Sequence, residues 1–256
     1  MFYDSENHYR NGRTMKPPTI QVVNHDDRKK IIEDHIKLLH SKSPGATLQI
    51  LEAGCGQAWW TNLNDIPYFL TGLDRDKDAL EIRRNRHGDL DDMILGDLRD
   101  ADLPDSKFDV IYCAFVLEHI QESETVLKNF LRWLKPGGIA IVLIPDPDSV
   151  SGFVTRMTPH WFHVWVLKNL FGNPDAGKPG HGPYPTFYTN VLSQSGMYKF
   201  CALNGFTVIE EARTQRYYGS KVNRLIFTSI TRLIGFLSIG LLHGEYDNAL
   251  YILEKS

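Results

Sequence analysis

The run Leu48–Leu51, followed by Glu52, Gly54 and Gly56, constrains this chain more than any other segment. An apolar run of strand length ends in an acid, and two glycines follow it. Only glycine adopts positive φ cheaply and lets the backbone approach a ligand this closely. A loop of this kind between a strand and a helix is typical of nucleotide binding. Because Gly-x-Gly also occurs in ordinary tight turns, the pair alone does not decide between the two.

Further strand-like runs follow at regular intervals and strengthen the nucleotide-binding interpretation. The first of them ends in Asp74, 20 residues after Gly54. An acid at that spacing suits a ribose diol, because a carboxylate accepts hydrogen bonds from both hydroxyls. In a parallel sheet the carboxyl ends of all these runs would form one ligand crevice. The runs are Tyr68–Asp74, Met93–Leu98, Phe108–Cys113 and, after Lys135-Pro136-Gly137-Gly138, Ile139–Ile144.

Over residues 48–145 this series resembles the class I S-adenosylmethionine (SAM)-dependent methyltransferases. Within that family it is similar to the small-molecule, type 11-like branch, which carries a Val-Leu-Glu-His signature, here residues 116–119. The resemblance implies an α/β fold with a doubly wound, Rossmann-like sheet. Seven strands are expected, with the last, at 249–253, antiparallel to the others. The implied activity is methyl transfer from SAM.

The resemblance also assigns cofactor contacts to residues of this chain. Glu52, Gly54 and Gly56 would surround the methionine part, Asp74 the ribose and Asp97 the adenine amine, while the backbone N–H of Leu98 would meet the adenine ring. Cys113, at the end of the fourth run, is the remaining predicted cofactor contact. Ala58 departs from the family pattern, which usually has a third glycine there, and puts the fine geometry of the loop in doubt.

Composition narrows the class of partner. The chain has 256 residues, a net charge of −3 and three widely spaced cysteines. A nucleic-acid partner usually leaves a basic footprint, so we expect none. The only compact basic run, residues 83–87, is interpreted as a solvated helix face. Free, mostly buried thiols and the lack of a signal-peptide pattern favour a cytoplasmic protein.

We expect two regions, an N-terminal helical segment at 1–45 that covers the cofactor site and a SAM-binding domain at 46–256. Within the second region, residues 145–190 break the strand–helix rhythm with seven prolines and eight aromatic residues other than histidine. This segment is too aromatic for disorder and too broken for a plain crossover. We interpret it as a lid over the substrate.

Residues 225–242 are apolar apart from a few small polar residues and one charge, Arg232. Their length approaches that of a membrane span, but strands on both sides should enter one sheet, so we expect no crossing. A buried crossover helix or a dimer face is the favoured interpretation. A peripheral membrane helix, or a wall for a lipid-linked acceptor, is the alternative.

Methyl transfer to a hydroxyl needs a base to take the proton, and histidine serves best near neutral pH. In related sugar and polyketide methyltransferases a similar histidine-rich segment often faces the acceptor. We therefore predict His181 as the base, with His163 as second choice. His119 is expected to pack within the Glu-His signature.

Two absences narrow the chemistry. Metal-dependent catechol-type methyltransferases need an acid at the end of the fourth strand, where this chain has Cys113-Ala114, so no metal is predicted despite Asp146. The Asn/Asp-Pro-Pro-Tyr motif is also missing. The acceptor is expected to be a small molecule, most simply a sugar or secondary-metabolite hydroxyl. N-methylation of a small amine, a non-catalytic SAM-binding protein and a nicotinamide-dependent dehydrogenase stay as alternatives, the last disfavoured by Asp97 and the Lys-Pro-Gly-Gly run.

Overall fold

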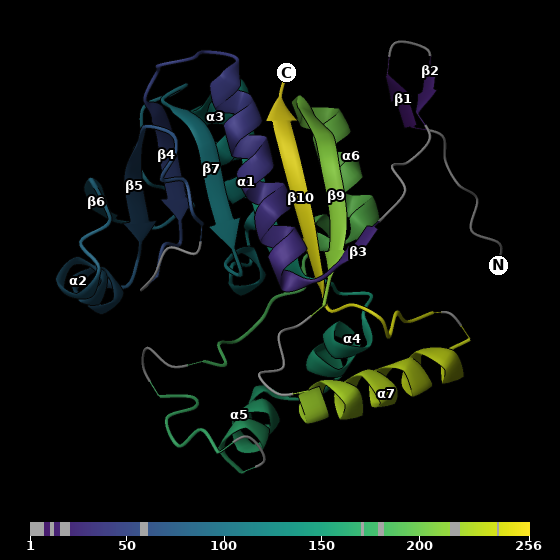
Figure 1. Ribbon diagram of the computed structural model, residues 1–256. Helices are drawn as coiled ribbons and strands as arrows, with labels where there is room; N and C mark the ends of the chain where they lie inside the picture. The colour runs from purple at the N-terminus through teal and green to yellow at the C-terminus, as the bar shows by residue number, and fades with distance from the viewer. Residues whose placement is uncertain are drawn as a thin grey trace.

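A central eight-stranded sheet organises the molecule, as a computed structural model shows (Figure 1). The structure describes residues 8–10, 13–15, 21–56, 61–169, 172–178, 182–215, 221–239 and 241–256. Across the sheet the strands are β3 (Gln21–Val23), β9 (Phe206–Thr214), β10 (Asn248–Lys255), β8 (Leu134–Pro145), β7 (Phe108–Ala114), β4 (Leu48–Ala53), β5 (Tyr68–Asp74) and β6 (Asp92–Leu95). A separate antiparallel pair is formed by β1 (His8–Arg10) and β2 (Arg13–Met15).

The strand directions confirm the doubly wound α/β prediction. Strand β10 is antiparallel to both β8 and β9, and the other neighbouring pairs in this sheet are parallel. Chain order reverses between β4 and β7, which is where ligands bind in open sheets of this kind. The sheet has one strand more than the seven expected. The additional strand, β3, has only three residues, which is too short to show a period in the sequence.

Helices cover both faces of the sheet and create two cores. On one face lies α1 (His25–Ser41), whose Ile32 and Ile36 are buried against β4 and β7. The other face carries α3 (Ser123–Trp133), with Phe130 and Trp133 fully buried. The helix α6 (Gln194–Asn204) lies on the α3 face, and α2 (Lys77–Arg86) follows β5.

Capping explains where several of these helices begin and end. The side chain of Asn24 accepts hydrogen bonds from the backbone N–H groups of Asp26 and Asp27, and so starts α1. Ser193 caps α6 through the N–H of Gly196. Gly205 closes this helix in a left-handed conformation.

The described parts of the segment at 145–190 lie beyond the carboxyl ends of the parallel strands (Figure 1). The segment contains α4 (Val150–Met157) and α5 (His160–Asn169), and the single-turn helix η2 (Asn190–Leu192) follows it. A further helix, α7 (Lys221–Leu237), lies at the same end of the molecule and contacts α4. The short helix η1 (Leu117–His119) follows β7 at this edge.

Of the two favoured interpretations of residues 225–242, the buried crossover helix is wrong, and the dimer face stays a prediction. Leu225, Leu233 and Phe236 of α7 are all exposed, so this helix does not contribute an apolar stripe to the core. Within the described residues, no helix combines the length and the apolar character that a membrane crossing requires.

Candidate cofactor and acceptor site

The glycine loop after β4 has the conformation that its sequence predicts. Both Gly54 and Gly56 have positive φ, at 73° and 52°. A Cβ on Gly54 would overlap the side chain of Val116, which follows β7, so only glycine lets these two segments meet. Among the described residues, a Cβ on Gly56 would meet nothing within 4 Å. The described part of the loop therefore brings Gly54 close to Val116 and leaves Gly56 uncrowded by the residues that the structure describes.

Behind the loop, a buried arginine holds the chain in place. Arg83 of α2 is fully buried, and its Nη1 donates a hydrogen bond of 2.7 Å to the carbonyl oxygen of Cys55. Its Nε and Nη2 donate to the carboxylate of Asp89, each at 3.0 Å. The expectation that residues 83–87 form a solvated face is therefore wrong for Arg83. Burial of a guanidinium requires several acceptors, and the sequence gives no sign of where they lie.

Arg83 also meets Glu52, for which the resemblance predicts a place beside the methionine part of the cofactor. The Arg83 Nη1 and Glu52 Oε2 atoms are 2.6 Å apart, and both side chains are buried. Burial raises the pKa of Glu52 to about 8, against the opposing effect of the Arg83 charge. The carboxyl group is thus held at the foot of the loop by a buried cation.

Asp74 lies at the carboxyl end of β5, beside the loop. Its Oδ2 accepts a hydrogen bond of 2.8 Å from the N–H of Gly56, and its Oδ1 accepts one of 2.9 Å from the N–H of Asp76. Each carboxylate oxygen has a further lone pair available. The carboxylate is therefore oriented by the backbone and still able to accept from a diol, which fits the predicted ribose contact.

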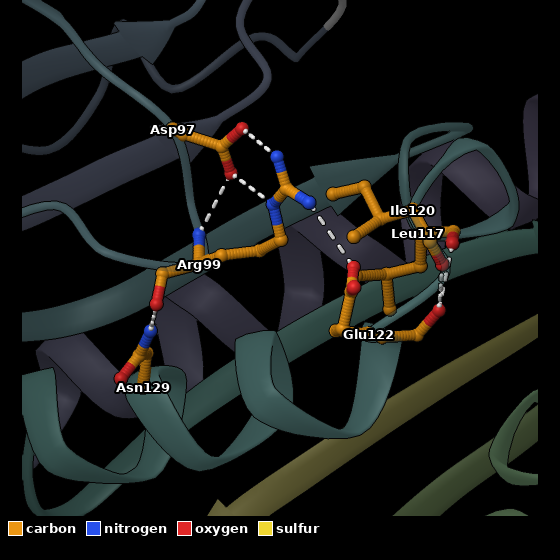
Figure 2. A network of polar contacts seen from close by, with 7 residues as sticks. Asp97, Arg99, Leu117, Ile120, Glu122 and Asn129 are labelled. Atoms are coloured by element: carbon orange, nitrogen blue, oxygen red, sulfur yellow. Dashed lines mark hydrogen bonds and ion pairs between the residues drawn. The ribbon is translucent and has the colours of Figure 1, made fainter.

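Asp97 takes part in a network that the sequence did not reveal (Figure 2). The guanidinium of Arg99 forms a bidentate pair with this carboxylate, with Nε donating to Oδ1 at 3.0 Å and Nη2 donating to Oδ2 at 2.8 Å. The remaining nitrogen, Nη1, reaches Oε2 of Glu122 at 3.1 Å. The hydrogen bonds from Arg99 lower the pKa of Asp97. This ionised carboxylate has a lone pair left on Oδ2 for the predicted adenine amine.

The neighbouring Leu98 presents a free backbone donor. Its carbonyl oxygen accepts a hydrogen bond of 2.9 Å from Asn129, and its side chain is buried. Among the residues described here, no acceptor bonds its N–H. An unpaired N–H beside a carboxylate matches the donor and acceptor edge of adenine. Gly56, the Asp74 carboxylate and this N–H together fit the adenosyl group of SAM.

The end of β7 supplies two features of a different kind. Cys113 is buried in the core on the α3 side, and burial raises the pKa of its thiol well above the usual range. Any contact between Cys113 and a cofactor would therefore come from its main chain.

Phe115, just after the strand, has a φ of 59° and is exposed. A positive φ is strained for an aromatic residue, and such strain gathers at functional sites. Sequence reasoning missed Phe115, because no residue pattern signals this strain.

The helix η1 connects the edge of the sheet to the segment at 185–189. The backbone N–H of Phe187 donates to the Glu118 carbonyl oxygen at 2.6 Å, and Nδ1 of His119 donates to the Pro185 carbonyl oxygen at 2.7 Å. Glu118 is buried, and desolvation raises its pKa to about 8. Within the described part of the chain, its Oε2 has no hydrogen-bond partner.

A pocket of about 550 Å³ lies between α4, α5 and the segment at 185–189. Its polar lining includes His163, whose Nε2 is 2.6 Å from Oγ1 of Thr158. Burial, and then the charge of His160, lower the pKa of His163. The lining residues are Thr155, Arg156, Thr158, His160, His163, Pro185, Thr186, Phe187, Tyr188 and Thr189.

Not all predicted positions meet at this site. His181, the first choice for the base, and Ala58 lie outside the described residues. Asp146, which a metal-dependent enzyme would use, instead pairs with the buried Arg213, with Nε and Oδ2 2.8 Å apart. In the described segments, no group of three or more His, Cys, Asp or Glu side chains is arranged to hold a metal ion.

Comparison with known proteins agrees with this geometry. Residues 51–142 match the family described as "Methyltransferase domain". A probable S-adenosylmethionine-dependent methyltransferase of Mycolicibacterium smegmatis is 33% identical over 169 residues, which cover 65% of this chain and 63% of the relative. A malonyl-[acyl-carrier protein] O-methyltransferase of Serratia marcescens is 28% identical over 102 residues, which cover 40% of this chain and 39% of the relative. The chain thus spans less than two thirds of the length of these relatives.

A solved structure shows the same fold. A putative S-adenosylmethionine-dependent methyltransferase from Listeria monocytogenes superposes with a TM-score of 0.55 at 14% identity, covering 89% of this chain and 98% of the other. The matched region contains the glycine loop and the acids at three strand ends. The strands β4 and β7, between which the chain order reverses, lie within or beside it. Residues 51–142 therefore match a methyltransferase domain, and the chain is similar over 65% of its length to a probable SAM-dependent methyltransferase.

Proposed function

We propose that this protein is an enzyme that transfers the methyl group of SAM to a small-molecule hydroxyl, on a sugar or a secondary metabolite. When bound, SAM supplies an electrophilic methyl group on a sulfonium. The transfer is a displacement, so the chain's main contribution is to hold the acceptor within reach and to exclude water. We propose residues 145–190 as the lid for this purpose.

The observation that carries the proposal is the attachment of the pocket to η1. The segment at 185–189 forms one wall of the pocket, and two hydrogen bonds tie it to Glu118 and His119. This pair belongs to the signature at the end of β7, next to the strand-order reversal. An acceptor in the pocket would therefore lie beside the cofactor edge of the sheet. Four threonines in the lining offer the hydroxyl partners that a polyhydroxylated acceptor needs.

His163 is the described residue best arranged to take the acceptor's proton. The single hydroxyl hydrogen of Thr158 goes to the carbonyl oxygen of Val154, at 2.6 Å. Thr158 must therefore accept from His163, which places the imidazole hydrogen on Nε2. That arrangement leaves the Nδ1 lone pair as the base. Because the His163 pKa is lowered, the ring is neutral and ready to accept a proton at pH 7.

Other observations support the proposed cover over the cofactor site, the proposed location and the proposed partners. Val23 pairs with Thr214 at the carboxyl end of β9, so α1 begins at the cofactor edge and the segment at 1–45 is well placed to cover it. Three free, buried cysteines support a cytoplasmic location. The exposed stripe within residues 225–242 supports a contact with a membrane surface or a second copy. No nucleic-acid partner is proposed.

The test measures S-adenosylhomocysteine formed from SAM with a panel of sugars and phenolic and alcoholic metabolites, alongside SAM affinity by calorimetry. His163→Ala is expected to lower turnover about 100-fold with SAM affinity unchanged, by loss of general-base catalysis. His160→Ala, in the same pocket, serves as the control. Full activity of His163→Ala would move the role to His181, tested by His181→Ala.

The alternatives give different results in the same assay. Turnover with small amines but with no hydroxyl acceptor would identify an N-methyltransferase. SAM binding without turnover on any acceptor, with full occupancy by calorimetry, would indicate a non-catalytic SAM-binding protein. Binding of NADH without binding of SAM would reject the proposal.

A further inference from the structure

Helix α7 packs on the protein through its small and polar residues. The hydroxyl of Thr231 donates to the carbonyl oxygen of Gly244 at 2.8 Å. Gly235, one turn later, lies so close to the chain at 242–244 that a Cβ there would be 3.1 Å from the Gly244 nitrogen and the Leu242 oxygen. Ser238 accepts a hydrogen bond from the N–H of Leu242. This stripe of Thr231, Gly235 and Ser238 is the face that the helix presents to its own protein.

Several apolar residues of the same helix are exposed. Phe236 is 81% exposed, and Leu225, Leu233 and Leu237 are also exposed. The stripe continues past the helix end, where Ile239 and Leu241 are 92% and 80% exposed. Gly235, Phe236, Leu237 and Ile239 line a surface hollow of about 610 Å³. A surface helix of a globular protein normally has the opposite orientation, and a continuous apolar stripe in water marks an interaction site.

The charge of this end of the molecule identifies the partner. The sequences of α4, α5 and α7 contain five Lys or Arg residues and no Asp or Glu. The whole chain has the reverse balance, with 28 Lys and Arg against 31 Asp and Glu. The basic residues are Arg156, Lys168, Lys221, Arg224 and Arg232. The exposed acids nearest to these helices, Asp148 and Glu245, lie in the connecting segments. The three helices themselves combine exposed apolar side chains with basic residues, which matches an anionic surface.

We propose that α7 and the adjoining residues to 241 dock this protein onto a membrane surface that contains anionic lipid. Helix α7 would lie in the plane of the interface with its apolar stripe among the acyl chains. Trp161 and Trp165 of α5, both exposed at the same end of the molecule, are of the type that favours the lipid–water boundary. A second copy is disfavoured as the occupant, because a two-fold contact through α7 would bring the basic residues of both helices together, and α7 itself carries no acid to pair with them.

Docking of this kind would place the pocket between α4 and α5 close to the lipid headgroups (Figure 1). The inference does not depend on the reaction that the pocket performs. It is tested by binding, so its failure would leave the proposed methyl transfer unaffected.

The experiment is sedimentation of the full chain with sucrose-loaded vesicles of phosphatidylcholine alone and of phosphatidylcholine with phosphatidylglycerol. We expect partition onto the anionic vesicles, weakening as salt screens the charges. The double variant Phe236→Ser/Leu237→Ser is expected to lower the partition coefficient about tenfold or more, through loss of buried apolar area. Leu203→Ser, on the exposed surface of α6, is the matched control and should bind like the wild type.

Circular dichroism and thermal melting establish that each variant is folded. Equal binding by the wild type and the Phe236/Leu237 variant would overturn the proposal, as would absence of binding to anionic vesicles. Sedimentation velocity without lipid tests the other possible occupant of the stripe, a second copy of the chain. A dimer that the same double variant converts to a monomer would show that the stripe is a contact between two copies, and would also overturn it.

Discussion

Replacement of Arg83 by methionine tests whether the glycine loop rests on a buried polar anchor. Arg83 is fully buried and serves three acceptors, the carboxylates of Glu52 and Asp89 and the carbonyl oxygen of Cys55. Removing one partner of a buried ion pair costs about 3–5 kcal/mol, since a charge is left without compensation. With a pKa of about 8, Glu52 already holds its proton for most of the time at pH 7, so the charge left without compensation is that of the partly exposed Asp89 carboxylate, and the loss lies at the lower end of that range. We therefore expect Arg83→Met to lower the free energy of unfolding by about 3 kcal/mol at pH 7.

The assay is equilibrium urea denaturation followed by circular dichroism without cofactor. Arg84→Met, on the exposed side of the same helix, is the control and should change the free energy of unfolding by less than about 0.5 kcal/mol. The double variant Glu52→Gln/Arg83→Met removes the buried Glu52 carboxyl group and leaves the partly exposed Asp89 as the carboxylate beside the missing guanidinium. It should be more stable than Arg83→Met alone, since coupled neighbours are not additive.

Calorimetry with SAM completes this test. Loss of the hydrogen bond to Cys55 frees the loop between Gly54 and Gly56, so Arg83→Met should also weaken SAM binding. A loss of stability no larger than that of Arg84→Met would refute the reasoning. So would an unchanged SAM affinity in a folded Arg83→Met protein, because the anchor would then be irrelevant to the loop.

Two further predictions concern acids at the same edge. Asp74→Ala should weaken SAM binding by about 1–3 kcal/mol, because the ribose hydroxyls and the N–H of Gly56 would lose their acceptor. The affinity is measured by calorimetry, and an unchanged value would exclude the ribose contact. The pKa of Glu118 is raised from about 4.5 to about 8, so the folded state holds a proton that the unfolded state releases, and the stability that this gives is lost as pH rises through that window. The urea midpoint should decrease as the pH rises from about 5 to about 8. Glu118→Gln should reduce the slope of midpoint against pH by roughly half, because the pKa of Glu52 is raised to a similar value and accounts for the rest. An unaltered slope in Glu118→Gln would contradict the assignment.

The sequence was enough for the architecture of the sheet. Apolar runs of strand length ending in Glu52, Asp74 and Asp97 predicted a parallel sheet, and parallel strands necessarily bring their carboxyl ends to one edge. The positive φ of Gly54 and Gly56 was predictable because glycine is the favoured residue there. The antiparallel last strand came from the family resemblance and is confirmed. These features are local, or follow from the chain order.

The partners of charged and apolar side chains were decided by the tertiary structure. Arg83 has the appearance of a surface residue in its basic run, and only the approach of α2 to the glycine loop brings Glu52, Asp89 and Cys55 around it. Helical spacing identified an apolar and a small-polar stripe on α7, but spacing is the same whichever stripe faces the protein. The close approach of Gly235 to the chain at 242–244 turned the apolar stripe to the outside. A pattern along one element fixes its faces, whereas the face that is buried depends on contacts with residues distant in the chain.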